Sequence, residues 1–269
     1  MTQQENTIPA SDSFTVHQTF DKFFMPPRKP PTEQEQKLQE QADIFTISAK
    51  PVDLTAYSWG KGATILLVHG WGGRAMQFFS FIEPLVELGY RILAFDAPAH
   101  GKTAGTQTNV FEFVEAIKTV VEKEGQIDSI IAHSLGSAAT AIALKEGILA
   151  RKIVFLGAVC NLSTIFTIFS KMAKLSPELE EELRVLIDNK LGKDAWQKFS
   201  VDKMDNFKIP ALLFHDRNDR EISYQESITI NESWRDSQLI LTSRLGHRRI
   251  LSNEQVIQQA VNFIADKQE

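Results

Sequence analysis

The chain has 269 residues, of which 43% are hydrophobic and 23% are charged, as in an ordinary soluble globular protein. A chain of this length can bury a full core without disulfides or metal, and its composition excludes a collagen-like repeat and a disulfide-stapled mini-protein. The formal net charge is −5, from 29 basic and 34 acidic residues. No segment has the clustered Lys and Arg that a phosphate backbone requires, so we expect no nucleic-acid partner.

The single cysteine and the first residues indicate a cellular compartment. Cys160 can form no internal disulfide, which fits a reducing cytoplasm. Residues 1–6 have neither a basic start nor an apolar run, so we expect no secretory signal. The stretch Ile153–Ser170 is uncharged over 18 residues, about the length of a membrane span. It contains Gly157 and Asn161 and begins with a β-branched run, which favours a buried strand, a loop and a helix instead. We therefore expect a cytoplasmic protein without stable membrane insertion.

Residues 1–43 form an N-terminal arm with a pattern of its own. Residues 26–31 contain four prolines and predict a stiff, polyproline-like spacer. Thr32 follows, with Glu35 three positions later, which is the pattern of a helix with a capping box. We expect the arm to dock on the core. A contact with a partner protein or with a second copy of the chain is the alternative, and the oligomeric state stays open.

From residue 44 onward, short apolar runs alternate with segments of helical length. We expect a pair of strands at residues 44–48 and 54–59, then apolar strands at 65–68, 91–95, 130–132, 153–156, 211–214 and 239–241. Helical patterns lie between them near 76–88, 109–124, 135–147, 223–234 and 253–265. This alternation predicts an α/β fold with a mostly parallel central sheet that helices cover on both faces.

Residues 162–206 interrupt the alternation, because they contain helical patterns and no strand-like run. A helical insertion at this point is well placed to lie over the carboxyl ends of the strands, where ligands bind in open α/β sheets. Phe166 and Phe169 belong to its first helical pattern. They are candidate substrate-binding residues in an apolar pocket wall, although packing of this helix on the core explains the same spacing.

The segment Ile130–Gly136 carries the sharpest chemical signal. It places Ser134 between a predicted strand and an alanine-rich helix, with His133 before it and Leu135 after it. A hydroxyl on a tight strand-to-helix turn is forced into a cleft, and small flanking residues are needed because the turn is crowded. The helix N-terminus adds backbone donors for developing negative charge. Ser134 is therefore the candidate nucleophile, and an ordinary buried serine at a helix start is the alternative.

This segment resembles the nucleophile elbow of the α/β-hydrolase superfamily, with Ala132 where the family usually has glycine. The resemblance covers residues 44–269 and implies one α/β-hydrolase domain with a helical cap inserted at about residues 162–206. It also implies a serine hydrolase of the esterase or lipase kind, which needs no metal and no organic cofactor.

A glycine-rich turn upstream resembles the oxyanion loop of the same family. The sequence His69-Gly70-Trp71-Gly72-Gly73 follows an early predicted strand. The resemblance implies that the backbone N–H groups of Trp71 and Leu135 form the oxyanion hole. His69 is expected to be a structural hydrogen-bonding residue rather than a base.

A second upstream turn, Asp96–Gly101, resembles one that is architectural in the family. Ala99 replaces the usual glycine there. Asp96 and His100 look like an acid and a base, but the resemblance implies that they stabilise the turn.

The acid and the base should follow the nucleophile in the order Ser, Asp or Glu, His. After the strand at 211–214, the family pattern Gly-x-x-Asp selects Asp219 as the acid, and Asp216 is the alternative. His247 lies 28 residues after Asp219 in a Gly-His segment that follows the last predicted strand. The resemblance implies that His247 is the general base.

Together these residues imply hydrolysis of a carboxylic ester, including a lipid-like acyl ester, through an acyl-enzyme on Ser134. The expected partner is a small-molecule acyl substrate. Thioesterase, amidase and carbon–carbon hydrolase activities of the same fold are alternatives, as is a ligand-binding member without activity. The acid and the base are flanked by arginines and carboxylates, which predict a solvated rim of mixed charge; the arginines are Arg217, Arg220, Arg248 and Arg249.

Overall fold

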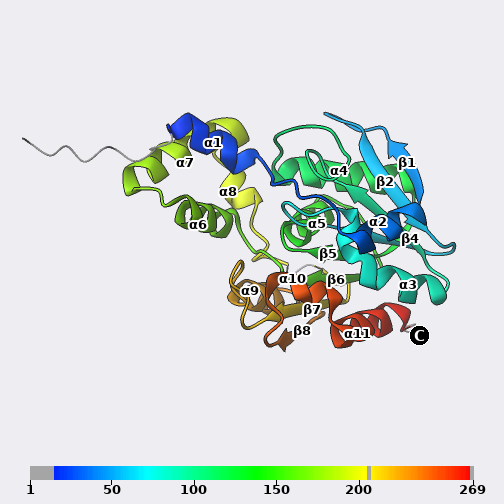
Figure 1. The fold of residues 1–269 in the computed structure, drawn as a ribbon. Helices are drawn as coiled ribbons and strands as arrows, with labels where there is room; N and C mark the ends of the chain where they lie inside the picture. Colours follow the sequence, from blue (N-terminus) through cyan, green and yellow to red (C-terminus); the bar gives the residue numbers. More distant parts are fainter. Residues whose placement is uncertain (1–14, 205–206, 267–269) are drawn as a thin grey trace, which may run out of the picture.

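The structure, a computed structural model, describes residues 15–204 and 207–266 and is built on one eight-stranded sheet (Figure 1). The strand order is β1-β2-β4-β3-β5-β6-β7-β8. Strand β2 pairs antiparallel with β1 and with β4, and every other neighbouring pair is parallel. The mostly parallel sheet and the paired first strands that the sequence predicts are thereby confirmed. The strands are β1 (Asp43–Ile47), β2 (Leu54–Trp59), β3 (Thr64–Val68), β4 (Arg91–Asp96), β5 (Ile127–His133), β6 (Lys152–Leu156), β7 (Ala211–Asp216) and β8 (Ser237–Thr242).

Helices cover both faces of the sheet because successive side chains of its central strands point to opposite sides. In β3, for example, Leu66 and Val68 belong to one buried cluster and Ile65 and Leu67 to the other. The first cluster packs beneath α4 (Val110–Glu124), α5 (Leu135–Lys145) and α9 (Gln225–Ser233). The second packs beneath α3 (Phe79–Glu87) and α11 (Glu254–Ala265). A turn of 3-10 helix at Ala75–Phe78 precedes α3, so the helix expected near 76–88 is made of two pieces.

Within the described ranges, three helices lie between β6 and β7, where the sequence predicts a helical insertion. They are α6 (Leu162–Ala173), α7 (Pro177–Leu191) and α8 (Ala195–Lys198), and Figure 1 shows them beside the sheet rather than on one of its faces. We call them the α6–α8 insertion. The uncharged stretch Ile153–Ser170 forms β6, a loop and part of α6. None of the helices in the described part of the chain is long and apolar enough to cross a membrane.

The N-terminal arm contains two short helices, α1 (Val16–Phe24) and α2 (Glu33–Glu40). Thr32 caps α2 and Glu35 completes the capping box, as its pattern predicts. Helix α1 lies beside α7 (Figure 1). Residues 1–14, which include the stretch considered above for a secretory signal, lie outside the described residues. The division into an arm at 1–43, a main domain at 44–269 and a cap at 162–206 stays a prediction.

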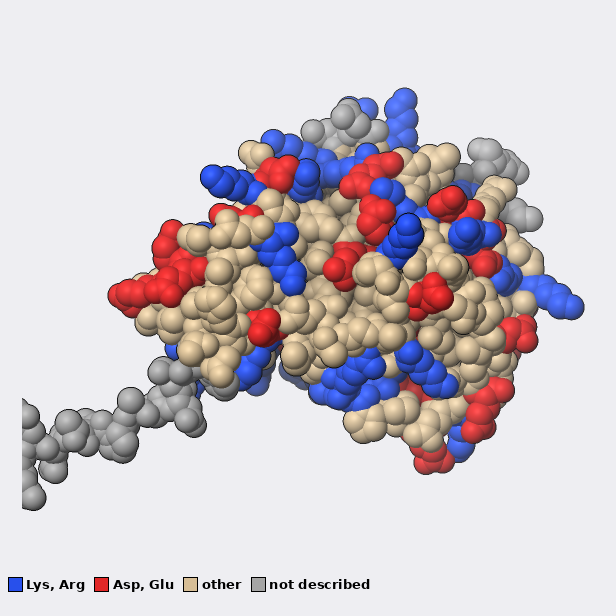
Figure 2. All heavy atoms as spheres, turned by 90° about the horizontal axis from the view of Figure 1, so that it is seen from above, with Lys and Arg blue, Asp and Glu red and all other residues tan. Residues whose placement is uncertain are grey.

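The charged side chains on the face drawn in Figure 2 are mixed in sign. Basic and acidic groups are interspersed there among uncharged residues, without a continuous field of one sign. This mixture on the visible face agrees with the small net charge of −5.

Candidate active site

Ser134 occupies a strained turn between a strand and a helix. Strand β5 ends at His133 and α5 begins at Leu135, so Ser134 alone makes the turn. Its backbone has φ 54° and ψ −124°, in the positive-φ region that side-chain-bearing residues rarely adopt. Such strain persists only where the surrounding structure enforces it, and it clusters at functional sites. The geometry is that of the elbow expected from the sequence.

Two glycines allow the elbow to pack against the loop after β3. A Cβ atom on Gly136 would lie 2.4 Å from the carbonyl oxygen of His69, and one on Gly70 would lie 2.8 Å from Cβ of Ser134. Both distances are too short for any side chain. The small residues of the two motifs therefore bring the loop at residues 69–73 into contact with the candidate nucleophile.

Trp71 and Leu135 border the same cavity as Ser134. Leu135 is the first residue of α5, so its N–H has no partner within the helix. Within residues 15–204 and 207–266, neither amide donates a hydrogen bond to another residue. Two free donors beside a hydroxyl are the arrangement that can stabilise an oxyanion.

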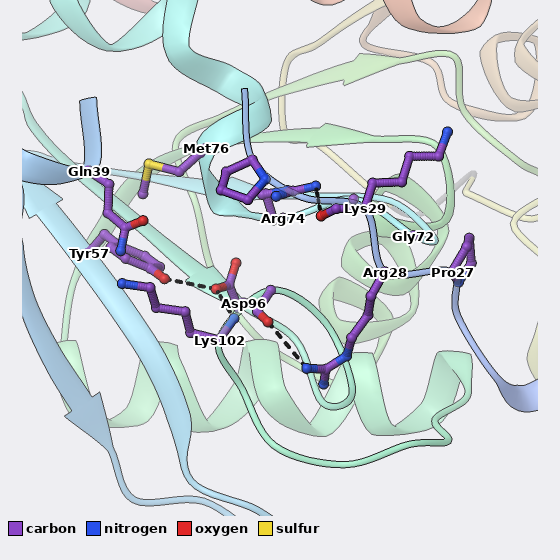
Figure 3. Close-up of a pocket in the computed structure, with 13 residues that line it drawn as sticks. Pro27, Arg28, Lys29, Gln39, Tyr57, Gly72, Arg74, Met76, Asp96 and Lys102 are labelled. Carbon is purple, nitrogen blue, oxygen red and sulfur yellow. Dashed lines mark hydrogen bonds between the residues drawn. The ribbon is translucent and has the colours of Figure 1, made fainter. Parts of the chain in front are cut away.

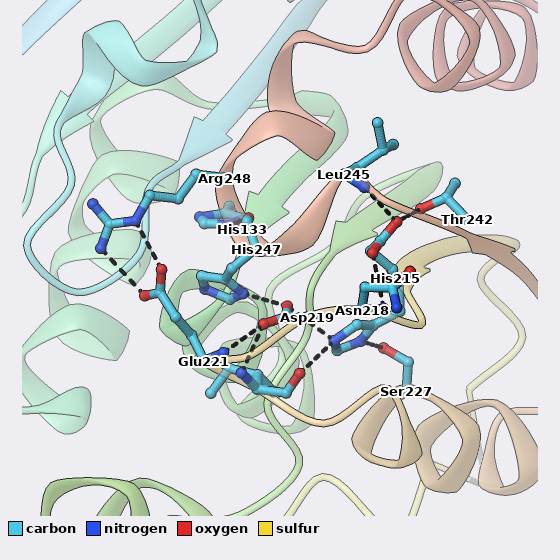
Figure 4. Close-up of polar contacts among 12 residues, drawn as sticks. His133, His215, Asn218, Asp219, Glu221, Ser227, Thr242, Leu245, His247 and Arg248 are labelled. Carbon is cyan, nitrogen blue, oxygen red and sulfur yellow. Dashed lines mark hydrogen bonds and ion pairs between the residues drawn. The ribbon is translucent and has the colours of Figure 1, made fainter. Parts of the chain in front are cut away.

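His247 and Asp219 form a buried pair beside this turn (Figure 4). Asp219 follows β7, and His247 lies in α10 (Gly246–Arg249) just after β8. Nδ1 of His247 lies 2.7 Å from Oδ2 of Asp219, and the two side chains are 7% and 1% exposed. A carboxylate can only accept here, so Nδ1 carries the proton and Nε2 is left as the basic nitrogen.

The carboxylate of Asp219 is held in its charged form by further donors. Its Oδ1 accepts hydrogen bonds from the amides of Glu221 at 2.8 Å and Ile222 at 2.9 Å. Nε2 of His215 lies 3.3 Å from its Oδ2. Burial raises the pKa of Asp219, but the hydrogen bonds from His215 and His247 outweigh it and hold the pKa well below its ordinary value.

Asp216, the alternative acid, faces away from the imidazole of His247. Its carboxylate accepts hydrogen bonds from the amides of Asn218 and Leu245 and from the hydroxyl of Thr242, at 2.8 to 3.0 Å. These contacts tie β7 to the loop after β8. The structure therefore brings Asp219, not Asp216, to His247.

His133 connects the elbow to the loop that carries His247. Its Nε2 lies 2.9 Å from the carbonyl oxygen of His247, and its Nδ1 lies 3.3 Å from Nε2 of Gln77. The two imidazole rings pack with their centroids 4.7 Å apart. Burial and the neighbouring His247 hold the pKa of His133 well below its ordinary value, so the ring is neutral and donates from Nε2.

A cavity of about 700 Å³ contains the candidate nucleophile and base, within the size range of small-molecule sites. Ser134, His247, Trp71, Leu135 and Phe169 all border it. Phe166 does not: its ring is buried against Trp196 and beneath the guanidinium of Arg184. Among the described residues, neither the Ser134 hydroxyl nor Nε2 of His247 has a hydrogen-bond partner. Both groups remain available to a ligand, and no hydrogen bond joins them to each other in this structure.

The N-terminal arm supplies part of the cavity wall, which the sequence interpretation did not anticipate. Phe23, Phe24 and Pro27 border the cavity together with the α6 residues. The missed signal is Thr15, whose hydroxyl caps α1, with Gln18 completing a capping box. This threonine–glutamine spacing predicts a helix start directly before the phenylalanines.

Comparisons with known proteins agree with the fold. The profile of the Alpha/beta hydrolase family matches residues 65–245. A non-heme haloperoxidase of Rhodococcus erythropolis is 28% identical over 95 residues, 34% of this chain and 35% of that protein. A 2-hydroxy-6-oxononadienedioate/2-hydroxy-6-oxononatrienedioate hydrolase of Escherichia coli K12 is 31% identical over 122 residues, 40% of this chain and 41% of that protein. The matches thus span less than half the length of these curated relatives.

Solved structures extend the likeness over most of the chain. An esterase of Pyrococcus furiosus superposes with a TM-score of 0.67 and 21% identity, covering 89% of this chain and 98% of that chain. At this identity the likeness concerns the fold. The family profile, however, spans more than half of the sequence, including the elbow, the loop after β3 and Asp219. The chain therefore belongs to the Alpha/beta hydrolase family.

Proposed function

We propose that this hydrolase cleaves carboxylic esters through an acyl-enzyme on Ser134. The observation that carries the proposal is the meeting of three features at one cavity: a serine at φ 54°, a buried His247–Asp219 pair and two unpaired amides. Each feature needs a particular local geometry. The residues that form the three features follow β3, β5, β7 and β8, which are separate in the sequence. Their convergence is the constellation that nucleophilic acyl transfer requires.

In the proposed reaction, Oγ of Ser134 attacks the ester carbonyl while Nε2 of His247 takes the hydroxyl proton. Asp219 keeps the proton of Nδ1 in place and stabilises the imidazolium that forms. The tetrahedral intermediate collapses, the C–O bond to the alcohol breaks, and His247 returns its proton to the leaving alkoxide. Water then attacks the acyl-enzyme by the same route and releases the carboxylic acid and free Ser134.

The amides of Trp71 and Leu135 are proposed to stabilise the carbonyl oxygen as it becomes negative. Because both are backbone groups, no side-chain substitution removes them directly. Loss of one such donor raises the activation barrier by about 3 kcal/mol in well-studied cases. Helix α5 points its N-terminus at the same position, which adds a favourable dipole. Phe169 is proposed to contact the acyl group, whereas the buried position of Phe166 favours a packing role.

Covalent labelling of the serine tests the proposal directly. A fluorophosphonate probe should label the wild-type protein and leave the Ser134→Ala variant unlabelled. Ser137→Ala is a matched control, since Ser137 lies in the same turn of α5 but its hydroxyl donates to the carbonyl oxygen of Ala132. Equal labelling of wild type and Ser134→Ala would point to another nucleophile. A panel of acyl esters then measures turnover, and saturable binding without turnover would favour a binding protein.

Carbon–carbon bond hydrolysis is the second candidate, favoured by the 31% identity to the hydrolase from Escherichia coli. That relative is named for a dioate, so an analogous substrate here would need cations at the cavity. The cavity arginines Arg74 and Arg248 both lie beside carboxylates, Glu35 at 3.7 Å and Glu221 at 2.9 Å. A dioate would have to compete with these carboxylates for the arginines, whereas Lys22 and Lys29 also border the cavity and could attract it. The apolar side chains of α1 and α6 along the cavity favour a neutral ester. Competitive inhibition by a C9 dicarboxylate would reverse this preference.

A cytoplasmic location stays part of the proposal. It rests on the single, buried Cys160, whose thiol has its pKa raised to about 11 by burial and is therefore unreactive.

A further inference from the structure

The N-terminal arm runs along the cavity that contains Ser134 and His247. Residues from the end of α1, from the proline-rich segment and from the start of α2 all border it. The bordering residues lie within positions 22–35, which precede the sheet in sequence. The arm is therefore a structural part of the proposed substrate site.

The arm contributes the apolar wall that faces α6. The ring of Phe23 lies edge-on to Phe169, with centroids 5.1 Å apart and planes at 89°, and edge-on to Phe24 at 5.1 Å. Ile165 and Ile168 of α6 continue the apolar surface. The side chains that face each other across this part of the cavity, those of Phe23, Ile165, Ile168 and Phe169, are all apolar, so it suits an alkyl chain rather than a polar group.

Polar contacts hold the arm in place beside the cavity. The guanidinium of Arg28 donates to the carbonyl oxygens of Ala99, Thr103 and Gly105 at 2.7 to 3.1 Å. Figure 3 shows its further bond to the carbonyl oxygen of Gly101 at 3.4 Å, and the bond from Arg74 to that of Lys29 at 2.6 Å. Arg28 thereby fastens the arm to the turn after β4. The same segment, with Pro27, Arg28 and Lys29, also borders a second, smaller cavity of about 140 Å³.

The arm also closes tightly over the loop after β3. A Cβ atom on Gly72 would lie 2.8 Å from Cγ of Pro27, so the spacer packs directly on the loop that carries Trp71. The amide of Thr108 donates to the carbonyl oxygen of Phe24 at 2.9 Å. The phenylalanines are therefore fixed from both ends, by the main body and by α7.

We propose that α1 and the proline-rich segment set the acyl-chain specificity of the site, with Phe23 and Phe24 forming the wall against which an unbranched alkyl chain of medium length packs. The inference rests on the proposed ester hydrolysis, because its kinetic test measures the turnover of esters. The preferred substrates are then esters whose acyl part is a straight hydrocarbon chain, entering between α1 and α6 with its carbonyl at Ser134.

The test compares Phe23→Ala with Phe20→Ala in hydrolysis of p-nitrophenyl esters from acetate to dodecanoate. Phe20 is the matched control, because it lies in the same helix and also packs edge-on to Phe24, at 5.0 Å, but does not border the cavity. Wild type should gain up to about fourfold in kcat/KM for each buried methylene until the compartment is full. Phe23→Ala should lower the decanoate-to-acetate ratio of kcat/KM about tenfold, and Phe20→Ala should leave it unchanged.

A second measurement separates the wall from the chemistry. Binding of decanoate and butyrate to the Ser134→Ala protein, with and without Phe23→Ala, requires no turnover. If Phe23→Ala weakens this chain-dependent binding while the wild-type protein cleaves none of the esters, the wall is supported and ester hydrolysis is overturned. Ester turnover with the same chain-length profile in wild type, Phe23→Ala and Phe20→Ala would overturn the wall. If Phe23→Ala does not fold, Phe23→Leu replaces it with a smaller apolar side chain.

Discussion

Two clusters of histidine and aspartate lie at the carboxyl edge of the sheet, one around Asp96 and one around Asp219. In the first, Asp96 accepts hydrogen bonds from the amides of Ala75 and Lys102 and from the hydroxyl of Tyr57, at 2.8 to 2.9 Å. His69 accepts from the amide of Ala97, and its other ring nitrogen contacts the carbonyl oxygen of Gly70. Every one of these side chains is bonded to the turn around it.

The second cluster differs in one respect. Asp219 is as fully bonded as Asp96, and His215 is held between the hydroxyl of Ser227 and the carbonyl oxygen of Ile222. Nε2 of His247, however, is left without a partner among the described residues, as is the hydroxyl of Ser134. Both clusters contain buried acids and imidazoles, so residue type alone does not mark a site. Unused hydrogen-bonding capacity beside a cavity does.

The largest effect should come from the histidine that has this free nitrogen. His247→Gln removes the proposed base, and kcat for a p-nitrophenyl ester should fall by about 10⁶-fold, as for the base of a serine protease triad. His69→Gln is the control in the other cluster: it removes a buried imidazole and should lower the melting temperature while the folded fraction retains turnover. Equal losses of kcat in the two folded variants would erase the distinction between the clusters.

The two aspartates on one turn sharpen the comparison within the second cluster. Asp219→Asn leaves the shape but presents an amide to Nδ1 of His247, which favours the wrong tautomer, and kcat should fall about 10⁴-fold. Asp216→Asn loosens the contacts to Thr242 and Leu245 and should mainly lower the free energy of unfolding. Measuring kcat and urea unfolding for both variants separates these outcomes. A greater loss of kcat in Asp216→Asn would reverse the assignment of the acid.

The pH dependence of the free energy of unfolding tests the cluster around Asp96, whose side chains are all hydrogen-bonded. Burial lowers the pKa of His69 to about 4 and that of His100 to about 3, whereas both titrate near 6.5 in the unfolded chain. Between these values the unfolded chain binds the protons and the folded chain does not, so the free energy of unfolding falls as pH falls. For His69 alone the loss approaches roughly 3 kcal/mol by pH 4.

The titration of Asp96 changes the free energy of unfolding in the opposite direction. Burial raises its pKa, so as pH falls Asp96 takes up a proton in the folded state before it does so in the unfolded chain. Between the two pKa values the free energy of unfolding therefore rises as pH falls. This gain partly offsets the loss from the histidines at low pH. Urea unfolding from pH 7 to pH 4.5 measures the slope. His69→Gln should flatten it, and a slope as steep as that of wild type would show that the acid sensitivity arises elsewhere, for instance at His133.

The strands and the order of the motifs could be predicted from the sequence because buried parallel strands are continuous apolar runs and the turns that follow them need particular small residues. The resemblance to the α/β-hydrolase motifs likewise predicted Ser134, Asp219 and His247 as the site residues. It did not exclude Asp216, because two carboxylates three residues apart on one turn differ only in side-chain direction, which the backbone of the folded turn decides. The family spacing gave a preference, and the contact with Nδ1 of His247 gives the geometric reason for it.

The cavity wall was less predictable because it joins segments more than 100 residues apart. Phe166 and Phe169 are three positions apart in α6, so the helical period places them on one broad face, yet Trp196 and Arg184 cover Phe166. Phe169 instead packs against Phe23 of α1. Only the tertiary arrangement of α1, α6 and α8 decides which phenylalanine borders the cavity.

The smallest effect is expected at the ion pair on the cavity rim. Arg248 and Glu221 lie within two positions of His247 and Asp219 in sequence, and their side chains are 2.9 Å apart. They are 60% and 48% exposed, against 7% and 1% for His247 and Asp219. An exposed pair contributes about 0 to 1 kcal/mol, so Arg248→Ala should change kcat/KM for a neutral ester by about fivefold at most.

A methyl ester that carries a distal carboxylate is the sensitive probe. If Arg248→Ala lowers kcat/KM for that ester far more than for its neutral analogue, Arg248 recognises an anionic substrate and the rim is part of the binding site; equal small changes would leave recognition to the apolar wall.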